Sequence, residues 1–137
     1  MLKRKVYQEL LKWKENTEGK ALCIIGARQI GKTTLIREFG KNEYEHFAEI
    51  NFVTDEKAAD IFKDKLTAEA IITNLTAYLQ TPLEPGKTLI LFDEVQECPA
   101  VRSAIKFLVE DGRFDYIESG SLLGVRDKEV RSYPVGF

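Results

Sequence analysis

The residues with the clearest chemical potential lie near the start of the chain: two glycines, Gly26 and Gly31, followed by Lys32 and Thr33. Four residues separate the glycines. Glycine lets the backbone bend tightly and approach phosphate oxygens closely. Consecutive N–H groups in such a bend form a nest for an anion, to which a lysine adds a mobile positive charge. The threonine hydroxyl suits Mg²⁺. This spacing therefore predicts a loop that binds a phosphate chain.

The segments on either side of this loop match its predicted role. Ala21–Ile25 has no polar side chain, which predicts a buried strand of a parallel sheet. Thr33–Phe39 is predicted to form a helix whose positive N-terminal end faces the phosphates, and Gly40 to end it in the left-handed conformation. Strand, glycine loop and helix together make the P-loop pattern. Its predicted nucleotide-binding residues are Gly26, Ala27, Arg28, Gln29, Ile30, Gly31, Lys32, Thr33 and Thr34.

A second apolar run, Thr88–Phe92, ends in two adjacent carboxylates, Asp93 and Glu94. A buried parallel strand delivers the residues at its end to the carboxyl edge of the sheet, where ligands bind in open α/β folds. After a P-loop, such a strand is the Walker B pattern. We predict that Asp93 holds Mg²⁺ through water, together with Thr33, and that Glu94 activates the attacking water as a general base.

Phe114–Ser119 is predicted to form the next strand, and Gly120 and Ser121 follow it. A polar side chain at this edge could sense the γ-phosphate or position the water. Ser121 is the first candidate and Ser119 the second, although a serine here could equally be a turn residue or a helix cap. Lys32, Glu94 and Ser121 form the predicted catalytic set.

The remaining segments alternate between helical and extended patterns, which predicts an α/β fold. Tyr7 and Trp13 are expected to pack against the sheet in preference to stacking on a base. The other predicted elements are a helix over 3–14, an edge strand over 46–53, a short helix over 58–62, a helix over 68–79 capped by Thr67, and a helix that begins near Pro99 and ends at Asp111–Gly112.

Size and composition limit the classes of function. With 137 residues the chain suits one domain over 1–137, in which 1–19 form a leading helix. A formal net charge of −2 provides no general attraction to nucleic acid. No apolar run approaches the length of roughly 18–20 residues that spans a membrane, and no signal sequence is recognisable. With a motif for ATP, this predicts a cytoplasmic protein.

The few cysteine and histidine residues give little indication of a metal site or a disulfide. Cys23 and Cys98 are far apart in the sequence, so neither a zinc site nor a disulfide framework is predicted, and both are expected to be small packing residues. His46 is the single histidine and lacks a cluster of partners nearby in the sequence, which disfavours a catalytic or metal-binding role for it.

Three segments, Gly26–Thr34, Leu89–Gln96 and Gly120–Leu123, together resemble the prokaryotic AAA-type ATP-binding proteins that carry a separate C-terminal domain of nuclease-like fold. The resemblance covers nearly the whole chain, and Arg28-Gln29 is its most specific part. It implies a P-loop NTPase three-layer sandwich with a mostly parallel sheet of the additional-strand (AAA/RecA-like) type, in strand order 5-1-4-3-2. It places Ala21–Ile25 in the centre and implies a missing or incomplete fifth strand.

The same resemblance carries further expectations. Lys32, Thr33, Asp93, Glu94 and Ser121 match the phosphate, metal, water and sensor positions of the family. Family members run to several hundred residues, so the chain is expected to be an N-terminal fragment that meets a protein or nucleic-acid client through the absent part.

The resemblance leaves open whether the protein forms a homo-oligomer in which an arginine from a neighbouring subunit completes the site. Arg126 and Arg131 are the candidates for this arginine. Arg28 could act within its own chain, but a salt bridge is the favoured role for it.

The predicted function is Mg²⁺-dependent binding and hydrolysis of ATP by a motor or switch. One alternative is a small-molecule kinase, which the acidic segment 41–70 and the adjacent carboxylates of Asp93 and Glu94 disfavour. Another is an interaction module that binds nucleotide without hydrolysis; replacing Glu94 by glutamine separates it from an ATPase. No Asn-Lys-x-Asp motif for guanine is present, which favours ATP.

Overall fold

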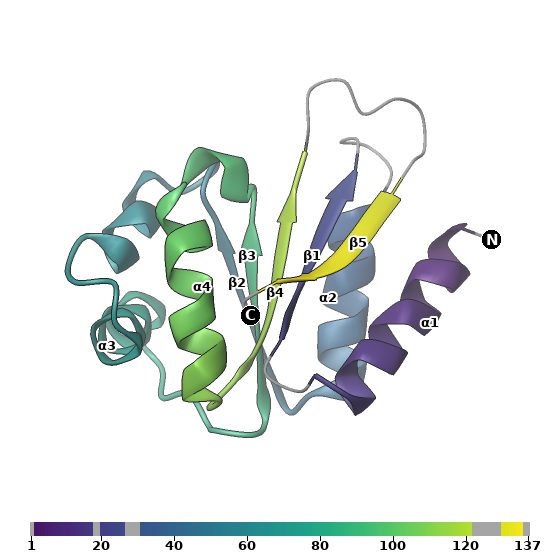
Figure 1. The fold of residues 1–137 in the computed structure, drawn as a ribbon, viewed down its shortest axis with the longest axis horizontal. Coiled ribbons are helices and arrows are strands. Elements are labelled where there is room, and N and C mark those ends of the chain that lie inside the picture. The colour runs from purple at the N-terminus through teal and green to yellow at the C-terminus, as the bar shows by residue number, and fades with distance from the viewer. Residues whose placement is uncertain (1, 18–19, 27–30, 122–129, 136–137) are drawn as a thin grey trace.

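Five strands form one sheet in the order β2-β3-β4-β1-β5 (Figure 1). The computed structural model describes the chain except residues 1, 18–19, 27–30, 122–129 and 136–137. Strands β1 to β4 are mutually parallel where they pair, as the sequence predicted. The strands are β1 (Ala21–Gly26), β2 (His46–Asn51), β3 (Thr88–Asp93), β4 (Asp115–Gly120) and β5 (Val130–Val135).

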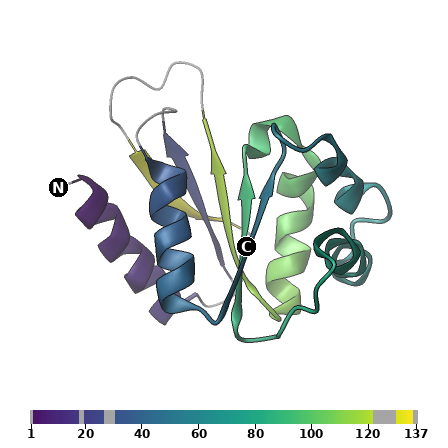
Figure 2. The same ribbon diagram turned by 180° about the vertical axis from the view of Figure 1, so that it is seen from behind.

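Helices cover both faces of the sheet, giving the three layers of an α/β sandwich (Figures 1 and 2). Alternate strand residues point to opposite faces, so Leu89 and Leu91 pack with α1 and α2, whereas Ile90 and Phe92 pack with α3 and α4. The helices are α1 (Leu2–Glu15), α2 (Lys32–Glu43), α3 (Ala68–Leu79) and α4 (Ala100–Asp111), with two 3₁₀ turns, η1 (Glu56–Phe62) and η2 (Val95–Glu97).

Helix α2 corrects one prediction. It does not end at Gly40 but continues to Glu43, and its C-cap is Tyr44 in an extended conformation. Gly40 is buried inside the helix beneath the ring of Phe47 on β2, and a Cβ at Gly40 would lie 2.3 Å from Phe47 Cδ1. The glycine therefore lets α2 approach the sheet closely and has no role in ending the helix.

Strand β5 corrects the expectation of a missing or incomplete fifth strand. It occupies the fifth place in the implied order, but it runs antiparallel to β1, with Gly26 opposite Val130 and Ala21 opposite Val135. Residues 121–129 connect β4 to β5. A parallel crossover needs a dozen or more residues, so the short separation in sequence between β4 and β5 favours the antiparallel direction of β5.

The other elements agree closely with the predictions. Strand β2 lies at the sheet edge, Thr67 Oγ1 accepts a hydrogen bond from Ala70 N as the N-cap of α3, and Gly112 ends α4 with φ 76°. Pro99 precedes the first residue of α4 as its N-cap, and the predicted short helix is the 3₁₀ turn η1.

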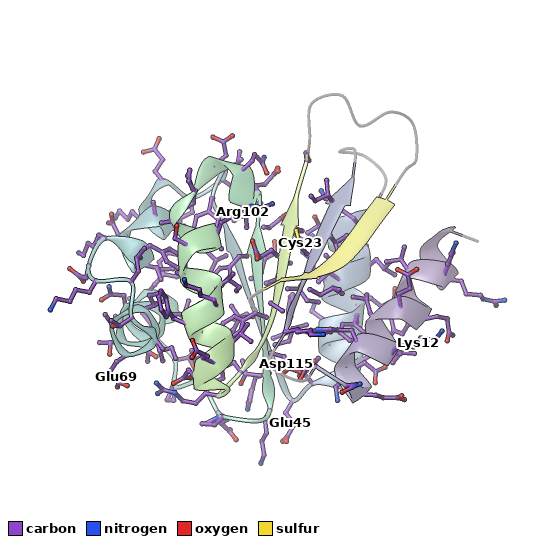
Figure 3. The ribbon with its side chains drawn as sticks, in the orientation of Figure 1. Lys12, Cys23, Glu45, Glu69, Arg102 and Asp115 are labelled. Atoms are coloured by element: carbon purple, nitrogen blue, oxygen red, sulfur yellow. The ribbon has the colours of Figure 1, made fainter. Side chains whose placement is uncertain are left out.

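The predicted packing of the aromatic residues is confirmed for Trp13, which is buried in the cluster that contains Leu22 of β1. Tyr7 is only partly buried and meets the ring of Phe39 on α2 edge-on, so its printed ring contact is with a helix and not with the sheet. Cys23, labelled in Figure 3, lies in the middle of β1, and both it and Cys98 are buried and not in a disulfide. Within the part of the chain that the structure describes, no helix is long and apolar enough to cross a membrane.

Candidate functional site

Three polar residues lie side by side where the parallel strands end. Asn51 on β2 is the register partner of Asp93 on β3, and Asp93 is the partner of Ser119 on β4. Parallel strands place their carboxyl ends at one edge of the sheet. The tertiary fold therefore gathers onto one row residues that lie far apart in the sequence.

Asp93 is the centre of this row. It is only 4% exposed, and its carboxylate accepts four hydrogen bonds from described residues. Ser119 Oγ and Glu94 N donate to Oδ1 at 2.6 and 2.9 Å, while Thr33 Oγ1 and Asn51 Nδ2 both donate to Oδ2 at 3.3 Å. These donors fix the orientation of the buried carboxylate.

The start of α2 faces Asp93 through Thr33. Its N-cap is Gly31, which has φ 77° and makes no side-chain capping bond. No described atom lies within 4 Å of the position that a Cβ of Gly31 would take. The first N–H groups of a helix lack partners inside the helix, so this end can bind an anion. Lys32, the first helical residue, is buried although it is charged.

A bidentate ion pair fixes α2 against β2 next to the row. Arg37 Nε and Nη2 donate to the two carboxylate oxygens of Glu49 at 2.6 and 2.8 Å. These hydrogen bonds raise the pKa of Arg37, and the negative charge of Asp93 adds to the effect. The pair thereby holds together the two elements that carry Thr33 and Asn51.

Glu94 follows Asp93 with an unusual backbone. Its φ of 59° and ψ of 46° are left-handed, and among the described residues only Gln80 is another non-glycine with positive φ. Gln80 caps the end of α3, where this conformation is common. Glu94 is instead the N-cap of η2, directly after the end of β3. A strained residue at a strand end is a feature of functional sites.

The two candidate serines occupy different environments. Ser119 is fully buried and bonds to Asp93, so its hydroxyl contacts the centre of the site directly. Ser121 donates its backbone N–H to Gln96 Oε1 at 3.4 Å, and its buried hydroxyl has no hydrogen-bond partner among the described residues. The second candidate, Ser119, is therefore the one that contacts Asp93, whereas the hydroxyl of Ser121 is buried without a described partner.

Several predicted residues cannot be placed beside this row. Ala27, Arg28, Gln29, Ile30 and Arg126 lie outside the described residues. Thr34 is exposed on α2, and the backbone of Arg131 lies in β5 opposite Ile25. His46 pairs with Glu84 at 2.9 Å, at the start of β2, which is the opposite end of that strand from Asn51.

Sequence reasoning missed two residues, Asn51 and Gln96. Asn51 was inside the predicted strand 46–53, but it ends β2, donates to Asp93 and accepts from Val53 N and Thr54 N. Gln96 donates to Glu94 Oε1 at 2.9 Å. The signal that could have indicated Asn51 was a polar residue at a predicted strand end, since strand ends meet at one edge of a parallel sheet.

The donor set fits Mg²⁺ shared with a nucleotide. Thr33 and Asp93 provide a hydroxyl and a carboxylate within hydrogen-bond distance, and Mg²⁺ commonly uses one or two such groups plus phosphates and waters. Within the described residues there is no group of three or more His, Cys, Asp or Glu side chains that could hold a metal unaided. The phosphates would complete the coordination.

The four parallel strands, the glycine-led helix and the acids at the end of β3 define an α/β domain of the P-loop NTPase class. A comparison with protein families matches residues 18–137 to the family described as an AAA domain. The chain belongs to this family, which indicates a nucleotide-binding, ATPase-like domain. A search of curated proteins found no match to the chain.

Proposed function

We propose that this chain binds ATP with Mg²⁺ at the carboxyl edge of β1, β3 and β4, and hydrolyses the bond between the β- and γ-phosphates. The observation that carries the proposal is the 3.3 Å contact between Thr33 Oγ1 and Asp93 Oδ2. These residues are 60 positions apart in the sequence. Their meeting at a helix N-terminus gives a phosphate-binding end and a metal-binding pair in one place.

Each residue has a distinct proposed role. Lys32 and the N–H groups at the start of α2 bind the phosphates, and Thr33 and Asp93 hold the metal. Bound Mg²⁺ supplies positive charge that offsets the charge developing on the phosphate oxygens. Glu94 accepts a proton from the attacking water. Ser121 is the proposed sensor, and Ser119 keeps Asp93 oriented.

The proposed domain covers residues 1–137 and includes α1, which precedes the matched residues. Leu10 and Trp13 of α1 are buried in the core that also contains Leu22 of β1. The proposal also includes a role as a motor or switch in the cytoplasm, a protein or nucleic-acid client, and an arginine from a neighbouring subunit that completes the site. Light scattering with and without Mg²⁺-ATP would report whether subunits assemble.

Binding is tested by calorimetric titration with Mg²⁺-ATP. We expect saturable binding by the native chain and by Lys41→Ala, a matched change at the exposed end of the same helix. Lys32→Ala should weaken binding at least about tenfold, because it removes the charge beside the phosphates. A folded native chain that shows no binding would contradict the proposal.

Hydrolysis is tested by phosphate release without an added acceptor, which also separates an ATPase from a kinase. We expect Glu94→Gln to retain nucleotide binding and to lower turnover by roughly 10²–10⁴-fold, the usual effect of a general base. Glu97→Gln, an exposed neighbour on η2, is the matched control. Equal turnover in the native chain and Glu94→Gln would instead support a module that binds nucleotide without catalysis by Glu94.

A further inference from the structure

One exposed side chain, Gln96, connects the ends of two neighbouring strands. Its Nε2 donates to Glu94 Oε1 at 2.9 Å, and its Oε1 accepts from Ser121 N at 3.4 Å. The amide thus contacts the acid that follows β3 and the backbone that follows β4. A carboxylate can only accept and an N–H can only donate, so these two partners determine which way the amide points.

The surroundings leave a defined space for this amide. Gly120, the last residue of β4, is buried, and a Cβ there would lie 2.8 Å from Gln96 Oε1. Any side chain at position 120 would therefore displace the amide. On the other side, the buried Val95 and Cys98 anchor η2 against the core. Gln96 is exposed to solvent, yet it lies on a turn anchored in the core and contacts the residue that follows the buried Gly120.

The side chain of Glu94 has several rotatable bonds, and each contact with it narrows the choice of rotamer. Its left-handed backbone sets the initial direction of the side chain, but the carboxylate can still adopt several rotamers. A hydrogen bond from an amide to a carboxylate restricts that choice. A general base must lie within hydrogen-bond distance of the water it deprotonates, so the restriction bears directly on the rate.

We propose that Gln96 is a positioning residue for Glu94, which orients the carboxylate toward the attacking water and links its orientation to the backbone at Ser121. The inference rests on the proposed function, in which Glu94 is the base. Gln96 itself is not expected to contact the nucleotide. Its substitution should therefore change the rate of hydrolysis and leave the affinity for ATP almost unaltered.

Steady-state kinetics with three substitutions of Gln96 provide the first test. Gln96→Ala should lower kcat by roughly 10–100-fold, the cost of a misplaced catalytic group, with KM within about twofold of native. Gln96→Glu keeps an acceptor for Ser121 N but opposes Glu94 with a like charge, so its kcat should be lowest. Gln96→Lys keeps a donor for Glu94 and should exceed Gln96→Glu. Glu97→Ala, on the same turn, should match the native chain.

A double-mutant cycle tests whether Gln96 acts through Glu94. If it does, Gln96→Ala should cause no further loss of kcat in a Glu94→Gln background, because the base is already absent. A full additional loss in that background would overturn the proposal. So would a native kcat in Gln96→Glu.

An NMR measurement tests the contact without relying on turnover. The side-chain amide signal of Gln96, identified by its absence in Gln96→Ala, should shift in Glu94→Ala but not in Glu97→Ala. No shift in Glu94→Ala would overturn the inference and leave the ATPase proposal standing. A shift of the Gln96 signal in a chain that binds nucleotide but releases no phosphate would support the contact with Glu94. It would also contradict the proposed hydrolysis, and with it the kinetic role of Gln96.

Discussion

At the scale of single residues, the hydrogen bonds to Asp93 have a measurable structural role. Ser119 is fully buried and donates to this carboxylate at 2.6 Å. Hydrogen bonds to charged groups contribute about 1.5–3 kcal/mol, so we expect Ser119→Ala to lower the free energy of unfolding by about that amount. Urea unfolding without nucleotide measures it. Ser103→Ala, an exposed serine on α4, should stay within about 0.5 kcal/mol of native, and equal losses in both variants would contradict this account.

The buried side chain of Glu118, next to Ser119, leads us to predict a pH dependence of stability that is opposite in sign to that of most acidic side chains. It is 1% exposed, and its Oε1 has no hydrogen-bond partner among the described residues. Burial raises the pKa of Glu118 above its ordinary value of 4.5, and the positive charge of Arg102 on α4 (Figure 3) offsets part of that rise. The native state therefore favours the neutral acid, and it loses stability as the pH rises from about 4.5 through the raised pKa.

Glu118→Gln should remove this loss because glutamine does not ionise. The free energy of unfolding of Glu118→Gln minus that of the native chain should therefore increase with pH from about 4.5 upward. Urea unfolding at a series of pH values measures the difference. Glu110→Gln on the exposed side of α4 is the control and should show a much smaller trend. A difference that decreases as the pH rises would refute the explanation.

At the scale of elements, the contact between α2 and β2 depends on Gly40. In an exposed helix interior, replacing glycine by alanine is stabilising by about 1 kcal/mol. Here the added Cβ would lie 2.3 Å from Phe47 Cδ1. We therefore expect Gly40→Ala to destabilise the chain by about 1–3 kcal/mol, the typical cost of overpacking.

Chemical denaturation of Gly40→Ala measures the loss. Adding Phe47→Leu, which shortens the opposing side chain, should make Gly40→Ala far less costly than it is in the native background. If Gly40→Ala were stabilising in the native background, Gly40 would behave as an ordinary helix glycine. Close packing against Phe47 would then not explain why a glycine is present at this position.

At the scale of the whole molecule, the candidate site joins elements from both the sheet and a covering layer. Thr33 lies on α2, while Asp93 lies on β3. A ligand held by both should stabilise the entire domain, by about 2.7 kcal/mol at a concentration 100 times its Kd, equivalent to a rise in Tm of roughly 8–12 °C. Thermal unfolding with ATP and Mg²⁺ measures this rise.

Removal of either partner of the ligand should abolish most of the thermal effect. Chelation of Mg²⁺ or the substitution Asp93→Asn should leave ATP with little stabilising effect, because the nucleotide and the metal share one site. Lys41→Ala should retain the full rise. An undiminished rise without Mg²⁺ would show that the metal is not part of the site.

Local and contiguous features were predictable from the sequence. Gly31, Lys32 and Thr33 follow an apolar run directly, so strand, turn and helix could be inferred together. The same holds for Thr88–Phe92 and the acids after it. Buried strands are marked by their own composition, and hence the parallel sheet, its two covered faces and the positions of Asp93 and Glu94 followed from short segments.

Only the tertiary structure decided what those segments meet. The hydrogen bond between Asn51 and Asp93 joins two strands, and the one between Gln96 and Ser121 joins η2 to the residue that follows β4. The place of Gly40 beneath Phe47, the burial of Glu118 and the direction of β5 likewise depend on which elements pack together. The physical reason is the range over which each effect acts. Secondary-structure propensity and hydrophobic pattern depend on a few neighbouring residues. Strand register, close packing and desolvation arise between residues that are far apart in the sequence.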